Sequence, residues 1–356
     1  MKVSIRDIAR SAGVSSTTVS HAISGKRPVS PATLAKVTAA MEEFGYAPSR
    51  SARNLALGKT QIIGLLVPDI GNAFFAELTK GVERVASGGQ YNVIIGNTGF
   101  DRARGLMHLE MIRSRAVDGV VYSAGSPFTD DEMSKATGGV PLVLVDGEIP
   151  GSPAPLVVSD NNDGGRLAAE HLLSLGHRHA LVINAPRGLL SGQHRVEGFL
   201  AAWESGGGQS VRIAEGGFTA DSGRDATRRN IREFDSGPLT AVFAVNDEMA
   251  IGALSEFRSR GIAVPGQVSV MGFDDIRSAR DMVPTLTTVQ QNVTQLGERA
   301  AELLLSILKT GQQPEASRIT VPVNLVARES TALVPMALAD ETHAPDMEIW
   351  REGKDR

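Results

Sequence analysis

The chain has 356 residues, 42% of them hydrophobic, and a formal net charge of −4. A chain of this length can bury a large core and is expected to form two or three domains. It contains no cysteine, which excludes disulfides, thiolate zinc sites and cysteine nucleophiles. No apolar run approaches the ~20 residues needed to span a bilayer, and the first residues lack the hydrophobic core of a signal peptide. We therefore expect a cytoplasmic protein that does not associate with membranes.

Charge is distributed unevenly along the chain. Residues 1–60 carry nine lysines and arginines against three acidic residues, a net charge of +6, whereas the remainder carries −10. A basic end on an acidic body is typical of a phosphate-binding module joined to a domain with a different task.

Residues 4–24 contain two short helical patterns joined by a tight turn. Apolar residues of the first pattern recur at helical spacing, at Ile5, Ile8, Ala9 and Ala12. Ser4 is placed to cap this helix, with Asp7 three residues on to complete a capping box. Gly13 supplies the backbone freedom that a sharp turn requires, and Ser15 caps the second helix. The inner stripe of the second helix consists of Val19, Ala22 and Ile23.

The outer face of the second helix is polar. Its short donors and acceptors are Ser16, Thr17, Ser20 and His21. Such a face at a helix N-terminus suits the reading of base edges in a major groove. We therefore interpret residues 1–47 as a helix-turn-helix head that reads DNA.

A third helix completes the head. Ser30 is a capping residue followed by Pro31 at the first helical position, and Gly45 closes the helix. The apolar stripe that we expect to form the core of the head is Leu34, Val37, Met41 and Phe44. The head ends before Pro48, because a proline disfavours helical conformation in the residue that precedes it.

Residues 48–60 form a short, alanine-rich segment. Such a segment is too short to be a stable helix alone in water, where about 12 to 15 residues are needed. One interpretation is a hinge helix that folds only against DNA and a second copy. Leu55 would then insert between base steps in the minor groove, with Arg50 and Arg53 near phosphates. A plain solvated linker is the alternative, and this segment alone does not decide between them.

After Thr60 the pattern changes to strands that alternate with helices. Strand signals occur at 62–67, 93–95, 117–122, 142–145, 180–183, 211–213, 241–245 and 268–271. This alternation predicts an α/β fold with parallel sheets covered on both faces. Two such series, divided near residue 160, predict two lobes.

Polar residues mark the carboxyl ends of these strands. They are Asp69, Asn97, Asp146, Asp160, Asn246, Asp247, Asp274 and Asp275. Each one taken singly is better explained as a helix cap or turn former. Open parallel sheets bind ligands at this edge, so the recurrence of polar residues in both lobes predicts a ligand cleft between them.

Signals for catalysis are missing from the sequence. No glycine-rich phosphate loop follows a strand, no G-x-S-x-G occurs, and no set of nucleophile and base can be assembled. His171, His177 and His179 are too loosely spaced to predict a metal site. We expect no metal, no cofactor and no enzymatic activity.

From Val3 to about Ser330 the sequence resembles the lactose-repressor (LacI/GalR) family of bacterial transcription regulators. The resemblance rests on the head motif IRDIARSAGVSSTTVSHAISG, the segment YAPS…ARNLALG, and the body motifs QHRVEGF, FAVND and MGFDD. It implies a two-lobe body like that of periplasmic binding proteins, in which the chain crosses between lobes three times. The implied units are 1–47 for the head, 48–60 for the hinge helix, 61–160 with 292–320 and 161–291 with 321–331 for the lobes, and 332–356 for a disordered tail.

The resemblance also implies DNA contacts. In this family the residues matching Ser16, Thr17 and His21 touch bases, and the residue matching Leu55 is the minor-groove wedge. The full set of expected DNA-binding residues is Ser4, Ser15, Ser16, Thr17, Thr18, Ser20, His21, Ser30, Arg50, Arg53, Asn54 and Leu55.

The family pattern singles out Arg195, Asn246 and Asp274 as ligand contacts. This set suits a polyol, because a carboxylate accepts from hydroxyls while guanidinium and amide groups donate to them. Phe74, Phe218 and Phe273 either cover an apolar ring face or belong to the lobe cores. The expected effector-binding residues are Asp69, Phe74, Asp146, Arg195, Phe218, Asn246, Asp274 and Gln291. The chain departs from the family pattern at Ala73, where relatives often have proline.

These features predict a bacterial, nucleoid-associated transcription regulator, most simply a repressor of a pseudo-palindromic operator. Its expected partners are double-stranded operator DNA and a small-molecule effector that is sugar-like in preference to a purine. A homodimer is expected, because the tail lacks the leucine heptads of tetramer-forming relatives. The alternatives are a purine- or nucleoside-responsive regulator and one controlled by a protein partner. A transport protein with similar lobes would predict no head, and a sugar-metabolising enzyme would predict a nucleophile or phosphate loop.

Overall fold

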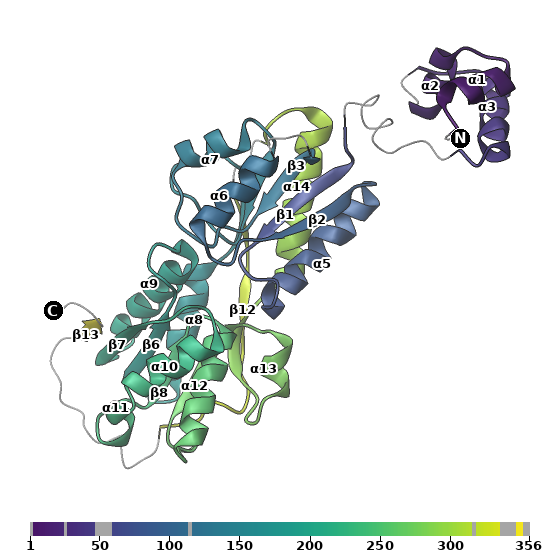
Figure 1. The fold of residues 1–356 in the computed structure, drawn as a ribbon. Coiled ribbons are helices and arrows are strands. Elements are labelled where there is room, and N and C mark those ends of the chain that lie inside the picture. The colour runs from purple at the N-terminus through teal and green to yellow at the C-terminus, as the bar shows by residue number, and fades with distance from the viewer. Residues whose placement is uncertain are drawn as a thin grey trace.

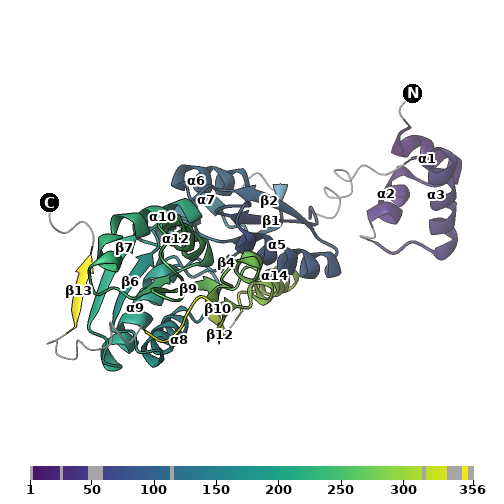
Figure 2. The ribbon, with the colours of Figure 1, turned by 90° about the horizontal axis from the view of Figure 1, so that it is seen from below.

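The computed structural model describes residues 3–24, 27–46, 59–112, 116–314, 318–334 and 347–351. These residues form a small helical head and a larger body of two sheets, which are separate in both views (Figures 1 and 2). The expected hinge contacts Arg50, Arg53, Asn54 and Leu55 lie outside the described residues. Within the described part, every helix is too short or too polar to cross a membrane.

The head contains α1 (Ile5–Ala12), α2 (Ser16–Ser24) and α3 (Pro31–Glu43). Ser4 donates from its backbone N–H and from Oγ to Asp7 Oδ2, at 3.0 and 2.7 Å, at the start of α1. Gly13 adopts φ 65°, so the left-handed turn after α1 falls on the residue that tolerates it. Ser15 Oγ accepts from the backbone N–H of Thr18 at 3.0 Å, and Ser30 caps α3 in the same way.

The core of the head differs in part from the expected stripe. The fully buried apolar residues are Ile8, Ala9, Ala12, Val19, Val37 and Ala40. Leu34 and Phe44, expected in this core, are 45% and 42% exposed. The reason is geometric: α1 and α2 have 8 and 9 residues and cannot cover all 13 residues of α3. The first turn and the C-terminal end of α3 therefore extend beyond the buried centre.

The first sheet of the body has six parallel strands in the order β11-β5-β4-β3-β1-β2. These are β1 (Ile62–Val67), β2 (Asn92–Asn97), β3 (Gly119–Tyr122), β4 (Leu142–Val145), β5 (Leu156–Ser159) and β11 (Arg318–Val321). Helices α5 (Ala73–Gly88) and α14 (Val293–Thr310) pack together beside this sheet, and α6 (Arg102–Met111) and α7 (Asp130–Thr137) lie on its other face (Figure 1). Val120 and Val121 of β3 join different hydrophobic clusters, as expected when successive side chains point to opposite faces.

The second sheet has seven strands in the order β12-β10-β9-β8-β6-β7-β13. These are β6 (His179–Asn184), β7 (Ser210–Glu215), β8 (Ala241–Ala244), β9 (Ser269–Asp274), β10 (Thr287–Gln291), β12 (Val323–Val326) and β13 (Glu348–Arg351). Helix α8 (Asn161–Ser174) packs on α9 (Leu190–Ser205), and α10 (Ala220–Arg229) packs on α12 (Asp247–Ser259). The short helices α11 (Arg232–Asp235) and α13 (Arg277–Asp281) complete this lobe.

Two features of the second sheet depart from expectation. Strand β12 pairs with β10 in the antiparallel direction, so this sheet is not purely parallel. Residues 332–356 were expected to be disordered, whereas β13 lies within them and pairs in parallel with β7 at the edge of the sheet. Residues 335–346 and 352–356 of that segment lie outside the described residues.

The chain passes between the two sheets at three places. It leaves the first sheet after β5, returns between β10 and α14, and leaves again between β11 and β12. The third passage is a single residue, Pro322. All three passages lie beside the carboxyl ends of β5, β10 and β11, so the lobes are joined at the edge where open parallel sheets bind ligands.

Candidate functional site

A cavity lies between the two sheets, at the carboxyl ends of eight of their strands. From the first lobe it is lined by Pro68, Asn72, Phe74, Phe75, Phe100, Ser123, Ala124, Ser126, Asp146, Gly147 and Glu148. From the second lobe it is lined by Gly188, Leu189, Leu190, Ser191, Arg195, Phe218, Asn246 and Asp274. The empty space inside it is ≈ 620 Å³ when the open solvent at its mouth is included.

Arg195 is the buried cation of this cavity. It projects from α9 and is only 3% exposed. Its Nε donates to Asn161 Oδ1 at 2.8 Å, and its Nη1 donates to the carbonyl of Val245 at 2.6 Å. Its guanidinium carbon lies 3.9 Å from the ring centroid of Phe273. The side chain is therefore fixed by α8, by the end of β8 and by an aromatic face, and it is among the residues that line the cavity.

The backbone beneath Arg195 approaches α8 closely. A Cβ added to Gly165 of α8 would lie 2.0 Å from the carbonyl oxygen of Arg195. Only glycine permits this distance between the two helices. The separation of α8 and α9 thus helps to determine where the guanidinium lies.

Two carboxylates flank Arg195. Asp274 Oδ1 lies 3.6 Å from Nη1, and Asp146 Oδ1 lies 3.9 Å from Nη2. The pKa of Asp274 is raised to about 7, chiefly by burial; Arg195 opposes this rise and the neighbouring Asp146 carboxylate adds to it. Burial also raises the pKa of Asp146 against the influence of Arg195. The guanidinium of Arg195 is therefore already paired with two carboxyl groups, so it does not offer an anionic ligand a free cation.

Several buried polar atoms at the cleft have no hydrogen-bond partner within the protein. Among the described residues these include Ser123 Oγ and Asp146 Oδ1 in the cavity wall and Gln291 Oε1 behind it. A buried donor or acceptor that makes no hydrogen bond lowers stability by about 1–3 kcal/mol. Such atoms are rare in native folds; Ser159 Oγ and Trp203 Nε1 are the other two found among the described residues.

The backbone is also strained around the cleft. Phe100, Asp146, Phe218, Asp274 and Asp275 all adopt positive φ, at 55°, 59°, 60°, 120° and 58°. Side chains other than glycine adopt this region at a cost of about 1–3 kcal/mol each. Strain of this kind persists where the surrounding structure imposes it, and four of these residues, Phe100, Asp146, Phe218 and Asp274, line the cavity.

Two aromatic rings from different lobes meet at the cavity. Phe100 and Phe218 stack with ring centroids 5.9 Å apart and an interplanar angle of 23°. Phe74 lines the same cavity. Phe273 does not line it, because it lies fully buried beneath Arg195. The cavity therefore combines polar groups on one side with apolar ring faces on another.

Six of the eight expected effector residues line the cavity: Phe74, Asp146, Arg195, Phe218, Asn246 and Asp274. Asp69 is not among the lining residues, and its Oδ1 instead accepts from the backbone N–H of Gly71 at 2.9 Å. Gln291 lies behind Asp274 and donates to its Oδ1 at 2.6 Å. Asn246 caps α12 as well, since its Oδ1 accepts from the N–H of Met249 at 3.0 Å.

The lining residues that sequence reasoning missed include Phe100, Ser123 and Glu148. Ser123 directly follows β3, so the rule of polar residues at strand ends would have found it. Phe100 follows β2 by three residues and adopts a left-handed backbone conformation, which the sequence does not predict.

The expected base-reading residues lie on one helix of the head. Ser15, Ser16 and Thr17 are exposed at the start of α2, whereas Thr18, Ser20 and His21 are half-buried. Ser4 and Ser30 are exposed caps of α1 and α3. The described part of the head thus presents the N-terminus of α2 to solvent.

Comparison with known proteins identifies both parts of the chain. Residues 4–49 match the family model described as bacterial regulatory proteins, lacI family. Residues 169–331 match the model of a periplasmic binding protein-like domain. The HTH-type transcriptional regulator DegA of Bacillus subtilis (strain 168) is 34% identical over 340 residues, covering 93% of this chain and 99% of DegA.

Solved structures agree with this assignment. The lac repressor dimer bound to operator and the anti-inducer ONPF has a TM-score of 0.81 at 27% identity, covering 93% of this chain and 100% of that one. A complex of the transcriptional regulator CelR with cellobiose has a TM-score of 0.68 at 30% identity, covering 92% and 100%. The predicted fold class, a helix-turn-helix head on a two-lobe α/β body, is thereby confirmed.

Proposed function

The chain belongs to the lacI family of bacterial regulatory proteins and is a DNA-binding transcription regulator, and we propose that a neutral polyhydroxylated molecule in the inter-lobe cleft controls it. In this proposal the protein is a repressor that binds a pseudo-palindromic operator as a homodimer. The observation that carries it is the buried Arg195 between Asp146 and Asp274.

The chemistry of this cluster favours a sugar. Each carboxylate accepts hydrogen bonds from hydroxyl groups, and the guanidinium donates to their lone pairs. Ser123 Oγ adds a buried hydroxyl that can serve either role. Sugar phosphates and sugar acids are disfavoured, because the guanidinium of Arg195 is already paired with two carboxyl groups. The cellobiose complex of the CelR structure supports the same class of ligand.

A purine or nucleoside is the second candidate. The Phe100–Phe218 pair offers a flat aromatic surface at the cavity, and a nucleobase would stack on it as readily as the apolar face of a sugar ring. Ring N–H groups of a neutral base would donate to the same two carboxylates. The two candidates differ in whether they need the hydroxyl-binding groups.

Apolar side chains on the first lobe support a homodimer. Ile94 and Ile95 on the edge strand β2 are 53% and 47% exposed, and Met107 and Met111 on α6 are 49% and 60% exposed. An open edge strand flanked by apolar side chains is a site for association. A two-fold pairing there would place two heads side by side, as a pseudo-palindromic operator requires.

DNA recognition is assigned to α2. We propose that Ser16, Thr17 and His21 contact base edges and that Ser4, Ser15, Thr18, Ser20 and Ser30 contact the phosphate backbone or position the helix. The net charge of +6 in residues 1–60 provides the electrostatic attraction. The hinge contacts Arg50, Arg53, Asn54 and Leu55 belong to the same proposal.

The experiment combines ligand screening with operator binding. The full chain is screened by thermal shift with D-ribose, D-glucose and cellobiose, their phosphorylated counterparts, and purine bases and nucleosides. A ligand at 100 times its Kd adds about 2.7 kcal/mol to the stability. The operator is selected from random duplexes, and its affinity is measured by fluorescence anisotropy with and without each hit. We expect a neutral sugar to stabilise the protein and to change operator affinity at least tenfold.

Asp274→Asn tests the location of the site. This isosteric change should remove the ligand response and leave operator binding without ligand unchanged, because the head is separate from the cleft. Asp131→Asn, in an exposed pair with Lys135 on α7, is the matched control and should respond normally. Tight binding of phosphorylated sugars without binding of neutral ones, or a normal response in Asp274→Asn, would contradict the proposal.

A further inference from the structure

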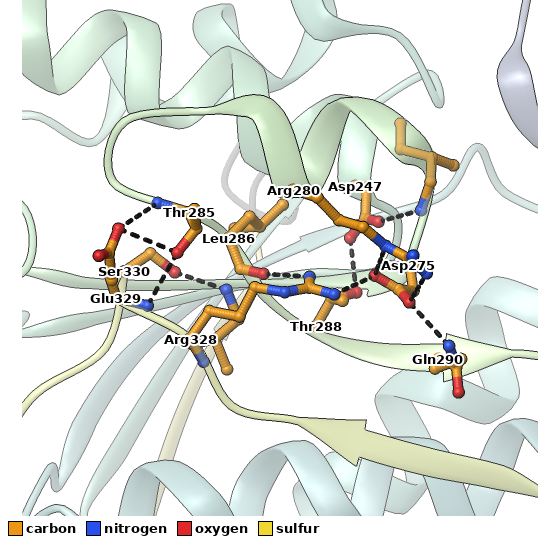
Figure 3. A network of polar contacts seen from close by, with 12 residues as sticks. Asp247, Asp275, Arg280, Thr285, Leu286, Thr288, Gln290, Arg328, Glu329 and Ser330 are labelled. Carbon is orange, nitrogen blue, oxygen red and sulfur yellow. Dashed lines mark hydrogen bonds and ion pairs between the residues drawn. The ribbon is translucent and has the colours of Figure 1, made fainter.

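We propose that Arg328 is a positioning residue of the cleft, which holds Asp274 toward the cavity by gripping the adjacent Asp275. This inference builds on the proposed function, since it concerns the carboxylate that we assign to ligand binding. The network joins Arg280 of α13, Gln290 of β10 and Arg328, which follows β12 (Figure 3).

The backbone conformation at Asp274 and Asp275 explains why such a restraint is needed. Asp274 and Asp275 are consecutive residues at φ 120° and 58°, and neither is glycine. Two adjacent residues in this region would relax if nothing restrained them. A relaxed turn would carry the Asp274 carboxylate away from Arg195. The orientation of Asp274 therefore depends on contacts made by its neighbours as well as on its own hydrogen bond from Gln291.

Asp275 is held by three donors. Arg328 Nη2 donates to Oδ1 at 2.5 Å, Arg280 Nη2 donates to Oδ2 at 2.6 Å, and Gln290 Nε2 donates to Oδ2 at 2.7 Å (Figure 3). The Asp275 side chain is 2% exposed. Although burial opposes it, the guanidinium groups of Arg280 and Arg328 hold the pKa of this carboxyl below its usual value. Asp275 is thus a permanently ionised anchor at neutral pH.

Arg328 is itself fixed at both ends. Its Nη1 donates to the carbonyl of Leu286 at 2.7 Å, and its backbone N–H donates to Thr287 Oγ1 at 2.8 Å. A planar guanidinium can hold a carbonyl and a carboxylate at once, which an ammonium cannot do in this geometry. The side chain is 15% exposed, whereas that of Arg280 is 57% exposed. Because exposed ion pairs contribute little to stability, Arg328 restrains Asp275 more strongly than Arg280 does.

The turn is anchored on its other side as well. Asp247 Oδ2 accepts from the backbone N–H of Ile276 at 2.9 Å, and Asp247 Oδ1 accepts from Thr288 Oγ1 at 2.6 Å (Figure 3). Gln290 binds Asp275 while its neighbour Gln291 binds Asp274. Successive residues of β10 therefore hold successive residues of the turn.

These contacts connect the turn to two passages between the lobes. Strand β10 leads directly into α14 of the first lobe, and Arg328 lies six residues after Pro322, the third passage. A displacement of either passage would move the groups that hold Asp275. Arg328 thereby links Asp274 to two of the connections between the lobes.

Hydrogen–deuterium exchange of the full chain without ligand tests this role. In Arg328→Met, exchange of the backbone amides from Asp274 to Arg277 should rise roughly tenfold, because the strained turn opens more often. Asp275→Asn should raise exchange similarly. The double variant should add little more, because each single change already disrupts the same contact between Arg328 and Asp275. Arg328→Lys should restore part of the protection. Arg280→Met, which removes a donor from the same carboxylate, should change exchange less than about threefold.

The outcomes separate positioning from general stability and from the proposed function. An equal rise in exchange across α5 and α12 would assign Arg328 a structural role and overturn the inference, as would unchanged exchange in Arg328→Met. Additive effects in the double variant would also overturn it. None of these readouts uses a ligand, so a failed sugar screen would contradict the proposed function and leave this inference standing.

Discussion

Polar side chains are buried at both the amino and the carboxyl ends of the strands of the second sheet, and the two groups differ in their hydrogen bonding. At the amino end, His177 is 1% exposed, and its ring nitrogens lie 2.9 Å from Thr240 Oγ1 and 2.9 Å from Ser269 Oγ. At the carboxyl end, Asp274 and Arg195 are equally buried and lie 3.6 Å apart, longer than a hydrogen bond. One cluster is fully bonded, and the other keeps unused donors and acceptors.

Ionisation follows the same division. Burial lowers the pKa of His177 to about 4, so the amino-end cluster is uncharged at neutral pH. Burial raises the pKa of Asp274 to about 7 at the carboxyl end, where a guanidinium keeps charge in the cluster. A buried polar group that serves only the fold is neutral and satisfied. A buried polar group that is charged or lacks hydrogen bonds therefore indicates a functional site, because natural folds break local rules mainly at functional sites.

The largest expected effect tests the amino-end cluster. His177→Ala should lower the free energy of unfolding by about 2–4 kcal/mol, because it leaves a cavity and strips two buried hydroxyls of a partner. The ligand response of the cleft should be unchanged. Chemical denaturation and the thermal-shift screen measure the two quantities.

The control for this change is His179→Ala, a half-buried histidine bonded to Ser210 Oγ at the outer strands. It should cost about 1 kcal/mol or less. The folded pKa of His177 lies below its unfolded value, so its contribution is present above about pH 6.5 and is lost as pH falls to about 4. A loss of ligand response in His177→Ala would break the contrast between the two ends.

Much of this architecture was predictable, because it rests on local rules. The capping box of Ser4 and Asp7 and the strand at residues 62–67 follow from short-range spacing, and both are present. The strands β5, β10, β11, β12 and β13 were not predicted, and β11, β12 and β13 pair with segments that are distant in the chain. Leu34 and Phe44 were misplaced since periodicity gives a face and not the extent of the helices that cover it.

The site was predictable to the extent that strand ends reveal it. Asp146 and Asp274 follow directly from that rule. Asp69 follows from the same rule and only stabilises a turn. The ionisation of the cleft carboxyls and the contact of Arg328 with Asp275 depend on segments that are far apart in the chain. No local sequence pattern predicts such contacts.

A second change reverses the usual effect of mutation. Asp274→Asn should raise the free energy of unfolding by about 1–3 kcal/mol at pH 8, because a buried carboxylate is replaced by a neutral amide of the same shape. Arg195 keeps Asp146 and Asn161 as partners in this variant. Denaturation from pH 5 to pH 8 measures the gain.

The sign of the pH dependence is set by the raised pKa. Folded Asp274 binds its proton more tightly than the unfolded chain does, so the wild type loses stability as pH rises toward about 7. The difference between Asp274→Asn and wild type should therefore shrink or reverse at pH 5. Asp131→Asn, on the exposed surface of α7, should show no such dependence. A destabilised Asp274→Asn at pH 8 would place this carboxylate among the satisfied groups of the fold.

The smallest effect comes from a pair of matched serines, one at each cluster. Ser123 Oγ is buried without a protein partner, whereas Ser269 Oγ contacts His177 and accepts from the N–H of Ala332 at 3.1 Å. Ser269→Ala should cost about 1–3 kcal/mol, because it leaves buried groups unpaired. Ser123→Ala should change stability by less than about 0.5 kcal/mol or increase it slightly, since no hydrogen bond is lost. The same substitution at two equally buried positions thus separates the cost of burying a hydroxyl from the value of its bonds. Equal losses measured by denaturation would mean that Ser123 is bonded in solution, and the cleft would lose one of the groups that distinguish it from the opposite end of the sheet.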